Sequence, residues 1–173
     1  KILGNGASWE IDDFFEKPVC LTEDIRNFHF SDPDTDQDGI PDWWENRFGY
    51  DPMIKDDHHL LDPDMDGLNN IEECYTAAYG SDPFHQDIFL EFDWMECRTR
   101  PGETNKPSDE YIQKAVDIFA AHNIALHIDV GELDGGEQIP YTANFSFAEL
   151  KDIYWDYFLD KDITNSRKGI FHY

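Results

Sequence analysis

Basic residues are scarce in this chain. Only 13 Lys and Arg side chains stand against 38 Asp and Glu in 173 residues, and the formal net charge is −25. Binding to nucleic acid requires a basic face that displaces counterions from phosphates, and anionic membrane surfaces repel acidic proteins for a similar electrostatic reason. The composition therefore excludes nucleic acid as a partner.

Cysteines and long apolar runs are also scarce. The three cysteines, Cys20, Cys74 and Cys97, are too few for a disulfide scaffold and lack the Cys-x-x-Cys spacing of many metal sites. No stretch approaches the roughly 18 apolar residues of a membrane span, so we expect no membrane insertion. Hydrophobic residues nevertheless make up 40% of the chain and aromatic residues 15%, which predicts a folded core instead of a disordered acidic tail.

Two acidic segments, residues 34–45 and 62–73, repeat each other. Each has oxygen-bearing side chains at positions 1, 3, 5 and 9, glycine at position 6 and glutamate at position 12, which is the pattern of a twelve-residue calcium loop. The residue at position 7 offers only its backbone carbonyl oxygen. The predicted ligands are Asp34, Asp36, Asp38, Ile40, Asp42 and Glu45 in the first loop, and Asp62, Asp64, Asp66, Leu68, Asn70 and Glu73 in the second.

Repulsion between these carboxylates argues for a bound cation. Carboxylates about 5 Å apart repel one another by roughly 3 kcal/mol per neighbouring pair at an effective dielectric constant of about 20, so we expect the loops to open without a cation. Many flexible oxygen ligands favour calcium over magnesium. Neither loop contains histidine or cysteine, which disfavours zinc. The sequence thus predicts two or more bound calcium ions.

The repeated segments also carry a family resemblance. The stretches DTDQDGIPDWWENRFGYDP and DPDMDGLNNIEECYTAAYGSDP resemble thrombospondin type 3 repeats and the related short calcium repeats of bacterial secreted proteins. The resemblance implies EF-hand-like loops, an extracellular or cell-surface location, and Asp51 and Asp82 as further ligands. Pro33 just before the first loop and Pro63 at the second position of the second loop are incompatible with a preceding helix, so we expect loop-helix units. We expect the spacer residues 56–59 to form a solvated turn.

The second half of the chain predicts an α/β body. Alternating apolar residues predict strands at 87–94, 124–130 and 168–173, and helical spacing predicts one helix beginning at Ser108 and another over 146–159. A strand-helix-strand unit of this kind has parallel strands. We therefore expect an α/β fold with a short, mainly parallel sheet. Its parts are an N-terminal segment packing on the body (1–30), tandem calcium-binding repeats (31–86) and a βαβαβ domain (87–173).

Polar residues lie on the opposite faces of the first two predicted strands, near their carboxyl ends: Glu91, Asp93, His127 and Asp129. Such a cluster is able to bind a metal or perform acid-base chemistry, but a packed sheet face without a site is the commoner outcome.

The segments DIFLEFDWM, IALHIDVGE and RKGIFHY are similar to a part of secreted bacterial metallopeptidase-like proteins. None of the seven histidines forms the His-Glu-x-x-His motif of those enzymes. We therefore predict no catalytic residues and no enzyme activity within this chain.

The leading hypothesis is a secreted or surface protein in which two acidic loops bind structural calcium and brace an α/β domain. Two alternatives stay open. One is the N-terminal part of a secreted zinc metallopeptidase-like protein whose catalytic residues lie beyond Tyr173. The other is a calcium-stabilised subunit of an extracellular fibre or layer, which would associate with itself or with an extracellular protein partner.

Overall fold

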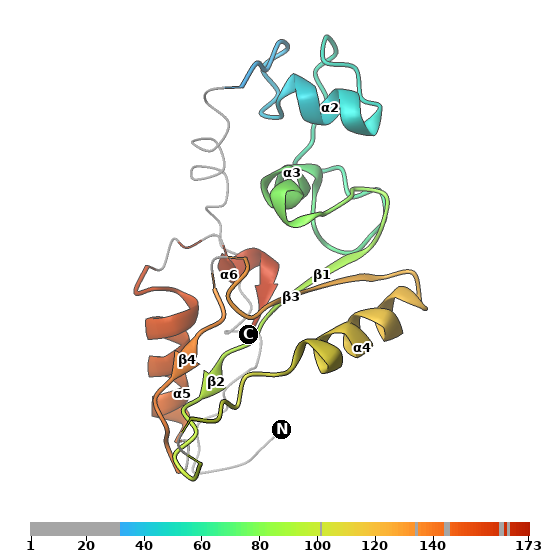
Figure 1. Cartoon of the computed structure of the whole chain (residues 1–173). Coiled ribbons are helices and arrows are strands. Elements are labelled where there is room, and N and C mark those ends of the chain that lie inside the picture. The colour runs from blue at the N-terminus through green and yellow to red at the C-terminus, as the bar shows by residue number, and fades with distance from the viewer. Residues whose placement is uncertain (1–31, 101, 134, 144–145, 163–164, 166) are drawn as a thin grey trace, which may run out of the picture.

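A computed structural model describes residues 32–173, apart from residues 101, 134, 144–145, 163–164 and 166. The predicted N-terminal segment, residues 1–30, lies outside the described residues. Within the described part the protein is a mixed α/β structure with five α-helices and a short parallel sheet (Figure 1). No helix there is long and apolar enough to cross a membrane.

The regular secondary structure in the acidic half of the described chain consists of helices. They are α2 (Asp42–Phe48), α3 (Asn70–Thr76) and the 3-10 helix η2 (Ala77–Tyr79). The second half contains, in order, β1 (Asp87–Glu91), β2 (Trp94–Met95), α4 (Asp109–Ala120), β3 (Ala125–Asp129), β4 (Gln138–Ile139), α5 (Phe147–Ile153), the π-helix η3 (Tyr154–Phe158), α6 (Arg167–Ile170) and β5 (Phe171–His172).

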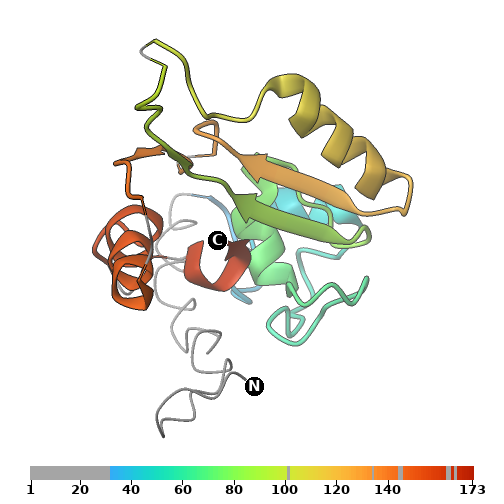
Figure 2. The same ribbon diagram turned by 90° about the horizontal axis from the view of Figure 1, so that it is seen from below.

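The main sheet has the strand order β3-β1-β5, and both pairings are parallel. Strands β1 and β3 pair over five residues, from Asp87 opposite Ala125 to Glu91 opposite Asp129, with α4 between them along the chain. The predicted parallel βαβ unit is therefore confirmed. Figure 2 shows α4 on one side of the sheet and α3 and α6 on the opposite side.

Two predicted strands differ from the structure. The strand expected at 87–94 ends at Glu91, because the chain turns where the carboxylate of Asp93 accepts a hydrogen bond from the N–H of Glu137 at 2.7 Å. Strand β2 then pairs with β4 in a separate two-stranded parallel sheet. The strand expected at 168–173 begins as helix α6, and only β5 pairs with β1.

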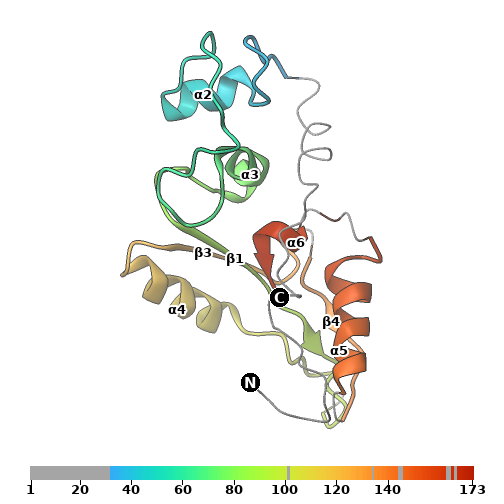
Figure 3. The same ribbon diagram turned by 180° about the vertical axis from the view of Figure 1, so that it is seen from behind.

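The buried apolar side chains form two clusters. The first unites the sheet, the C-terminal elements and the second acidic loop, and contains Leu68, Phe89, Phe158, Leu159, Ile170 and Phe171. The second joins the first acidic loop and α2 to α3, and contains Ile40, Trp44, Ile71 and Cys74. Figures 1 and 3 both show α3 between α2 and the strands of the sheet. The two acidic loops are therefore anchored in different parts of the core.

Candidate metal centres

The two acidic loops, residues 34–45 and 62–73, fold alike because their own N–H groups hold the carboxylates. In the first loop, Asp34 accepts hydrogen bonds from the N–H of Gln37 at 2.8 Å and the N–H of Gly39 at 3.1 Å. In the second, Asp62 accepts a hydrogen bond from the N–H of Gly67 at 3.2 Å. The sharp turn at position 6 requires positive φ, which is 101° at Gly39 and 99° at Gly67. Sequence spacing alone thus accounts for the shape of both loops.

The first loop gathers a cluster of acidic side chains. The carboxylates of Asp34, Asp36 and Asp38 offer ligand atoms within 4.8 Å of one another. Asp38 also belongs to a second group with Glu45 and His58, whose ligand atoms lie within 4.8 Å of one another. Glu45, at the end of the loop in α2, is fully buried, and neither of its carboxylate oxygens has a hydrogen-bond partner among the described residues. Burial first, and then repulsion from Asp38, raises the pKa of Glu45 to about 7.

The second loop gathers a matching cluster. Asp62, Asp64 and Asp66 lie within 4.8 Å of one another, and Asp66 forms a second group with Glu73 and Asp87. The side chain of Glu73 is 1% exposed, and both its carboxylate oxygens lack a hydrogen-bond partner within the described chain. Burial and the neighbouring Asp87 raise the pKa of Glu73 to about 9. Each loop therefore holds a buried glutamate whose carboxylate oxygens have no hydrogen-bond partner among the described residues.

The glutamate of each loop is positioned by the helix that follows the loop. Helix α3 begins with a capping box, in which the side chain of Asn69 accepts hydrogen bonds from the N–H groups of Ile71 and Glu72, and Glu72 accepts one from the N–H of Asn69. The hydroxyl of Ser81 donates to the backbone oxygen of Glu73 at 2.8 Å and fixes the next turn. Helix α2 instead begins at Asp42, after Pro41 in an extended conformation that provides no side-chain cap hydrogen bond.

The residues at position 9 differ between the loops. The carboxylate of Asp42 accepts hydrogen bonds from the N–H and the hydroxyl of Thr35, both at 2.7 Å. The amide nitrogen of Asn70 lies 2.9 Å from Nδ1 of His58, whereas its buried Oδ1 has no partner in the part of the chain that the structure describes. Asp42 therefore ties the first loop together, while Asn70 retains an oxygen able to bind a cation.

Sequence reasoning missed two residues of the clusters. His58 belongs to the spacer that we expected to form a solvated turn, but it is fully buried, so that expectation was wrong for this residue. Its ring lies edge-on to Tyr50 at 4.9 Å and to Trp44 at 6.1 Å, measured between ring centroids. Asp87 was assigned only to a strand, yet it is 5% exposed and faces the second cluster. No local signal marks either residue, because both approach from outside the loops.

Asp51 and Asp82, which the family resemblance implied as further ligands, lie outside the acidic clusters found among the described residues. Both are exposed, and each carboxylate accepts a hydrogen bond from an N–H two residues later, from Met53 and Phe84 respectively, at 3.0 Å. Their geometry is that of residues closing a turn before the next segment.

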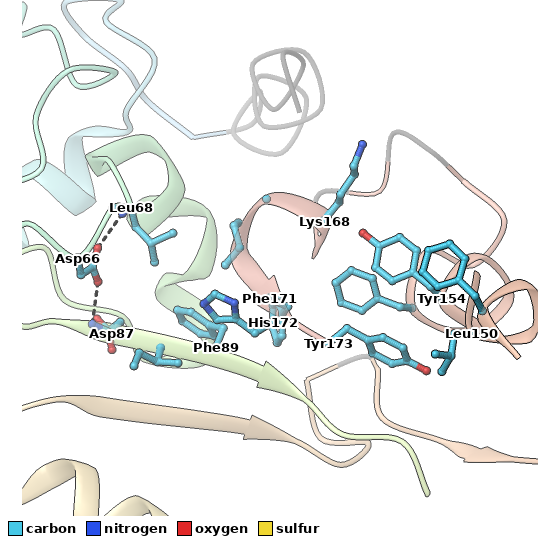
Figure 4. Close-up of a pocket in the computed structure, with 16 residues that line it drawn as sticks. Asp66, Leu68, Asp87, Phe89, Leu150, Tyr154, Lys168, Phe171, His172 and Tyr173 are labelled. Atoms are coloured by element: carbon cyan, nitrogen blue, oxygen red, sulfur yellow. Dashed lines mark hydrogen bonds between the residues drawn. The ribbon is translucent and has the colours of Figure 1, made fainter. Parts of the chain in front are cut away.

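A cavity of about 460 Å³ opens beside the second cluster, between the loop, the sheet and α5. Figure 4 shows Asp66 at one end of it, hydrogen-bonded to the N–H of Leu68 at 2.7 Å and to the N–H of Asp87 at 2.7 Å. The remaining walls are mainly aliphatic and aromatic. The loop is thus joined directly to the first residue of β1.

The carboxylates at the ends of β1 and β3 form a buried ion-pair network. Arg167 places Nε 2.6 Å from Oε2 of Glu91 and one terminal nitrogen 2.6 Å from Oδ2 of Asp129. The same arginine donates to the backbone oxygen of Leu133 at 2.6 Å. The single guanidinium balances the charge of only one of the two carboxylates. Burial raises the pKa of Glu91 to about 7 despite the neighbouring Arg167, and Oε1 of Glu91 has no hydrogen-bond partner among the described residues.

The other two members of the predicted polar cluster lie elsewhere. Asp93 accepts hydrogen bonds from the N–H of Glu137 and, at 2.8 Å, from the hydroxyl of Tyr173. The ring of His127 stacks on Phe89 at 4.4 Å between centroids and its Nε2 contacts Asp87. The sheet groups therefore do not converge on one acid-base site in the described residues.

Comparisons of the chain with protein-family models, with curated proteins and with solved structures find no match.

Proposed function

We propose that this chain is a calcium-binding protein, secreted or at the cell surface, in which calcium in the two acidic loops braces the α/β body. The observation that carries the proposal is the pair of buried glutamates, Glu45 and Glu73, whose carboxylate oxygens have no hydrogen-bond partners within the described chain. A buried carboxylate without a partner is strongly unfavourable, and such groups in folded proteins are normally paired or bound to a metal.

The donor set supports calcium. Calcium prefers about six to eight oxygen ligands from a flexible loop, including both oxygens of a glutamate at the final loop position. Asp36 and Asp64 at position 3, and Asp62 at position 1, also have buried carboxylate oxygens without partners among the described residues. Each loop therefore presents several carboxylate oxygens that need a cation, in the order along the chain that a calcium loop requires.

The connections of the second loop support a structural role for the ion. Asp66 accepts a hydrogen bond from the N–H of Asp87, the first residue of β1, and Leu68 packs in the same cluster as Phe89 of that strand. A cation that neutralises Asp66 and Glu73 thereby stabilises the start of the central strand. Extracellular calcium loops bind at about 10⁻⁴ to 10⁻³ M, which suits a location where calcium is abundant.

Calcium titration of the metal-free protein tests the proposal. Calorimetry should detect two bound calcium ions, and the melting temperature should rise as the sites fill. At 100 times the dissociation constant, each site adds about 2.7 kcal/mol to the free energy of unfolding. A double variant, Glu45→Gln with Glu73→Gln, keeps the size of both side chains and should bind no calcium. If the wild-type protein binds no calcium at millimolar concentration, the proposal is wrong.

A further inference from the structure

The two clusters differ in one chemical group. Each combines the aspartate at loop position 5 and the glutamate at position 12 with a third residue from outside the loop. In the second cluster that residue is Asp87, alongside Asp66 and Glu73. In the first it is His58, whose ring nitrogen lies within 4.8 Å of ligand oxygens of Asp38 and Glu45. The first cluster thus offers an imidazole nitrogen where the second offers a carboxylate oxygen.

The imidazole of His58 is held in place with one nitrogen directed at the cluster. The residue is fully buried, and its Nε2 lies 3.1 Å from Oδ2 of Asp38 without forming an aligned hydrogen bond. Both carboxylate oxygens of the neighbouring Glu45 also lack partners in the described chain. Asp38 itself accepts hydrogen bonds from the N–H groups of Ile40 and Asp56, both at 3.1 Å. The buried imidazole of His58 and the buried carboxylate of Glu45 thus lie against it with atoms that have no partner in the described chain, which is the arrangement of a metal site.

The other ring nitrogen has the partner that a metal-binding histidine needs. A histidine that binds a metal through one nitrogen usually donates the N–H of the other to an oxygen, which fixes the tautomer and the orientation of the ring. Asn70 lies 2.9 Å from Nδ1 of His58 through its side-chain amide. A half-turn of that amide places its oxygen at the same position, where it accepts the N–H of Nδ1 and leaves the lone pair of Nε2 for a cation. Asn70 then no longer offers this oxygen to the second loop, whose position 9 would bind its ion through a water molecule.

We propose that Asp38, Glu45 and His58 form a mixed nitrogen-oxygen site that binds a first-row transition-metal cation such as Zn²⁺ more tightly than Ca²⁺. The inference rests on the proposed function, because it takes both loops to be metal sites and assigns them different cations. Imidazole is a good ligand for zinc and its neighbours but a poor one for calcium, which prefers oxygen. Two carboxylates and one imidazole also suit the three protein ligands of a zinc site. The expectation that zinc is disfavoured took into account only residues within the loops, whereas His58 lies outside them.

Zinc titration of the calcium-loaded protein tests the inference. Calorimetry should detect one zinc ion that displaces calcium from the first loop and leaves calcium bound at the second. The variant His58→Asp gives the first cluster the same ligand types as the second, so it should keep calcium binding. Its zinc affinity should fall by about 10- to 100-fold. The matched control is His59→Ala, which removes an exposed imidazole next to the buried one and should leave zinc binding unchanged.

A measurement on the wild-type protein guards against misfolding of the variant. The ¹⁵N resonances of the imidazole rings should show one histidine whose Nε2 shifts on zinc binding while its Nδ1 stays protonated. The inference is wrong if zinc binds the first loop no more tightly than calcium, if no imidazole resonance responds, or if a folded His58→Asp variant keeps its zinc affinity. Failure of the proposed function has a different signature, because the wild-type protein would then bind neither cation in either loop.

Discussion

The two acidic loops have similar internal geometry, apart from position 9, but different surroundings. Residues 34–45 and 62–73 share the pattern of carboxylates, the positive φ at glycine and the buried final glutamate. The second loop packs Leu68 against the sheet core, whereas the first packs Ile40 against Trp44 and α3. The twelve-residue pattern therefore determines the shape of a loop. If both loops bind cations as proposed, residues outside the pattern determine which cation each loop prefers and how much of the fold that cation stabilises.

The largest expected effect concerns the apolar residue at position 7. Leu68→Ala should lower the free energy of unfolding of the α/β body by about 2 to 5 kcal/mol, because it leaves a cavity in the cluster that contains Phe89. Ile40→Ala makes the same kind of change in the cluster around Trp44. Native-state hydrogen exchange should show lost protection in β1 for the first variant and mainly in α2 for the second. Equal loss of protection in β1 would contradict the difference in anchoring.

The next effect concerns the final glutamate of each loop. In saturating calcium, Glu73→Gln should cost about 2.7 kcal/mol, the linkage energy of a site filled at 100 times its dissociation constant. Without calcium the same variant should be at least as stable as the wild-type protein at alkaline pH, because it removes a buried charge that has no partner among the described groups. Urea unfolding with and without calcium measures the change in the free energy of unfolding under each condition.

Glu45→Gln is the matched control for that experiment. The calcium-dependent loss of stability in this variant should appear in α2. The stability of the sheet should change less, because the first loop does not share the core cluster of β1. If the two variants lower the stability of the sheet equally, calcium at the first loop braces the body as directly as calcium at the second.

A smaller effect concerns protons. Burial raises the pKa of Glu73 to about 9 and that of Glu45 to about 7 in the metal-free protein, above the ordinary glutamate value of 4.5. The folded metal-free protein therefore holds protons that the unfolded chain has released, so its stability should fall as pH rises from about 4.5 toward these values.

Calcium requires both carboxylates ionised, so binding at neutral pH should release protons and the calcium affinity should rise with pH. Calorimetry in two buffers of different ionisation enthalpy counts the released protons. More protons should be released from the second loop than from the first, and release should disappear well above the pKa of Glu73. Release of the same number of protons at neutral and at strongly alkaline pH would contradict their assignment to Glu45 and Glu73.

Much of the loop geometry could be predicted from the sequence because it is local. The carboxylates, the glycine and the final glutamate of each loop lie within twelve residues, and their spacing alone requires the turn that the structure contains at Gly39 and Gly67. The parallel pairing of β1 and β3 was equally predictable, since alternating apolar residues flank a helix.

Other features of the structure could not be predicted from the sequence, because they depend on contacts between residues far apart in the chain. His58 is buried because Tyr50 and Trp44 pack around its ring, which no spacing rule indicates. The residues before β5 form the helix α6 although their apolar pattern predicts a strand. The arginine at the start of that helix binds carboxylates at the ends of β1 and β3, so its position depends on how the sheet assembles.

The smallest expected effect concerns position 9. Asp42→Asn should change calcium affinity at the first loop by no more than about 0.5 kcal/mol in binding energy. The asparagine oxygen is able to accept the N–H of Thr35 and its amide is able to donate to the Thr35 hydroxyl, which preserves both 2.7 Å contacts of the aspartate. Asn70→Ala, the matched change in the second loop, removes an oxygen without a partner in the described structure and also the contact with His58, so it should weaken binding more. Calorimetric titration of both variants measures the difference. If Asp42→Asn abolishes binding at the first loop, Asp42 must leave Thr35 to reach the cation, and the two loops would then become alike at position 9 once filled.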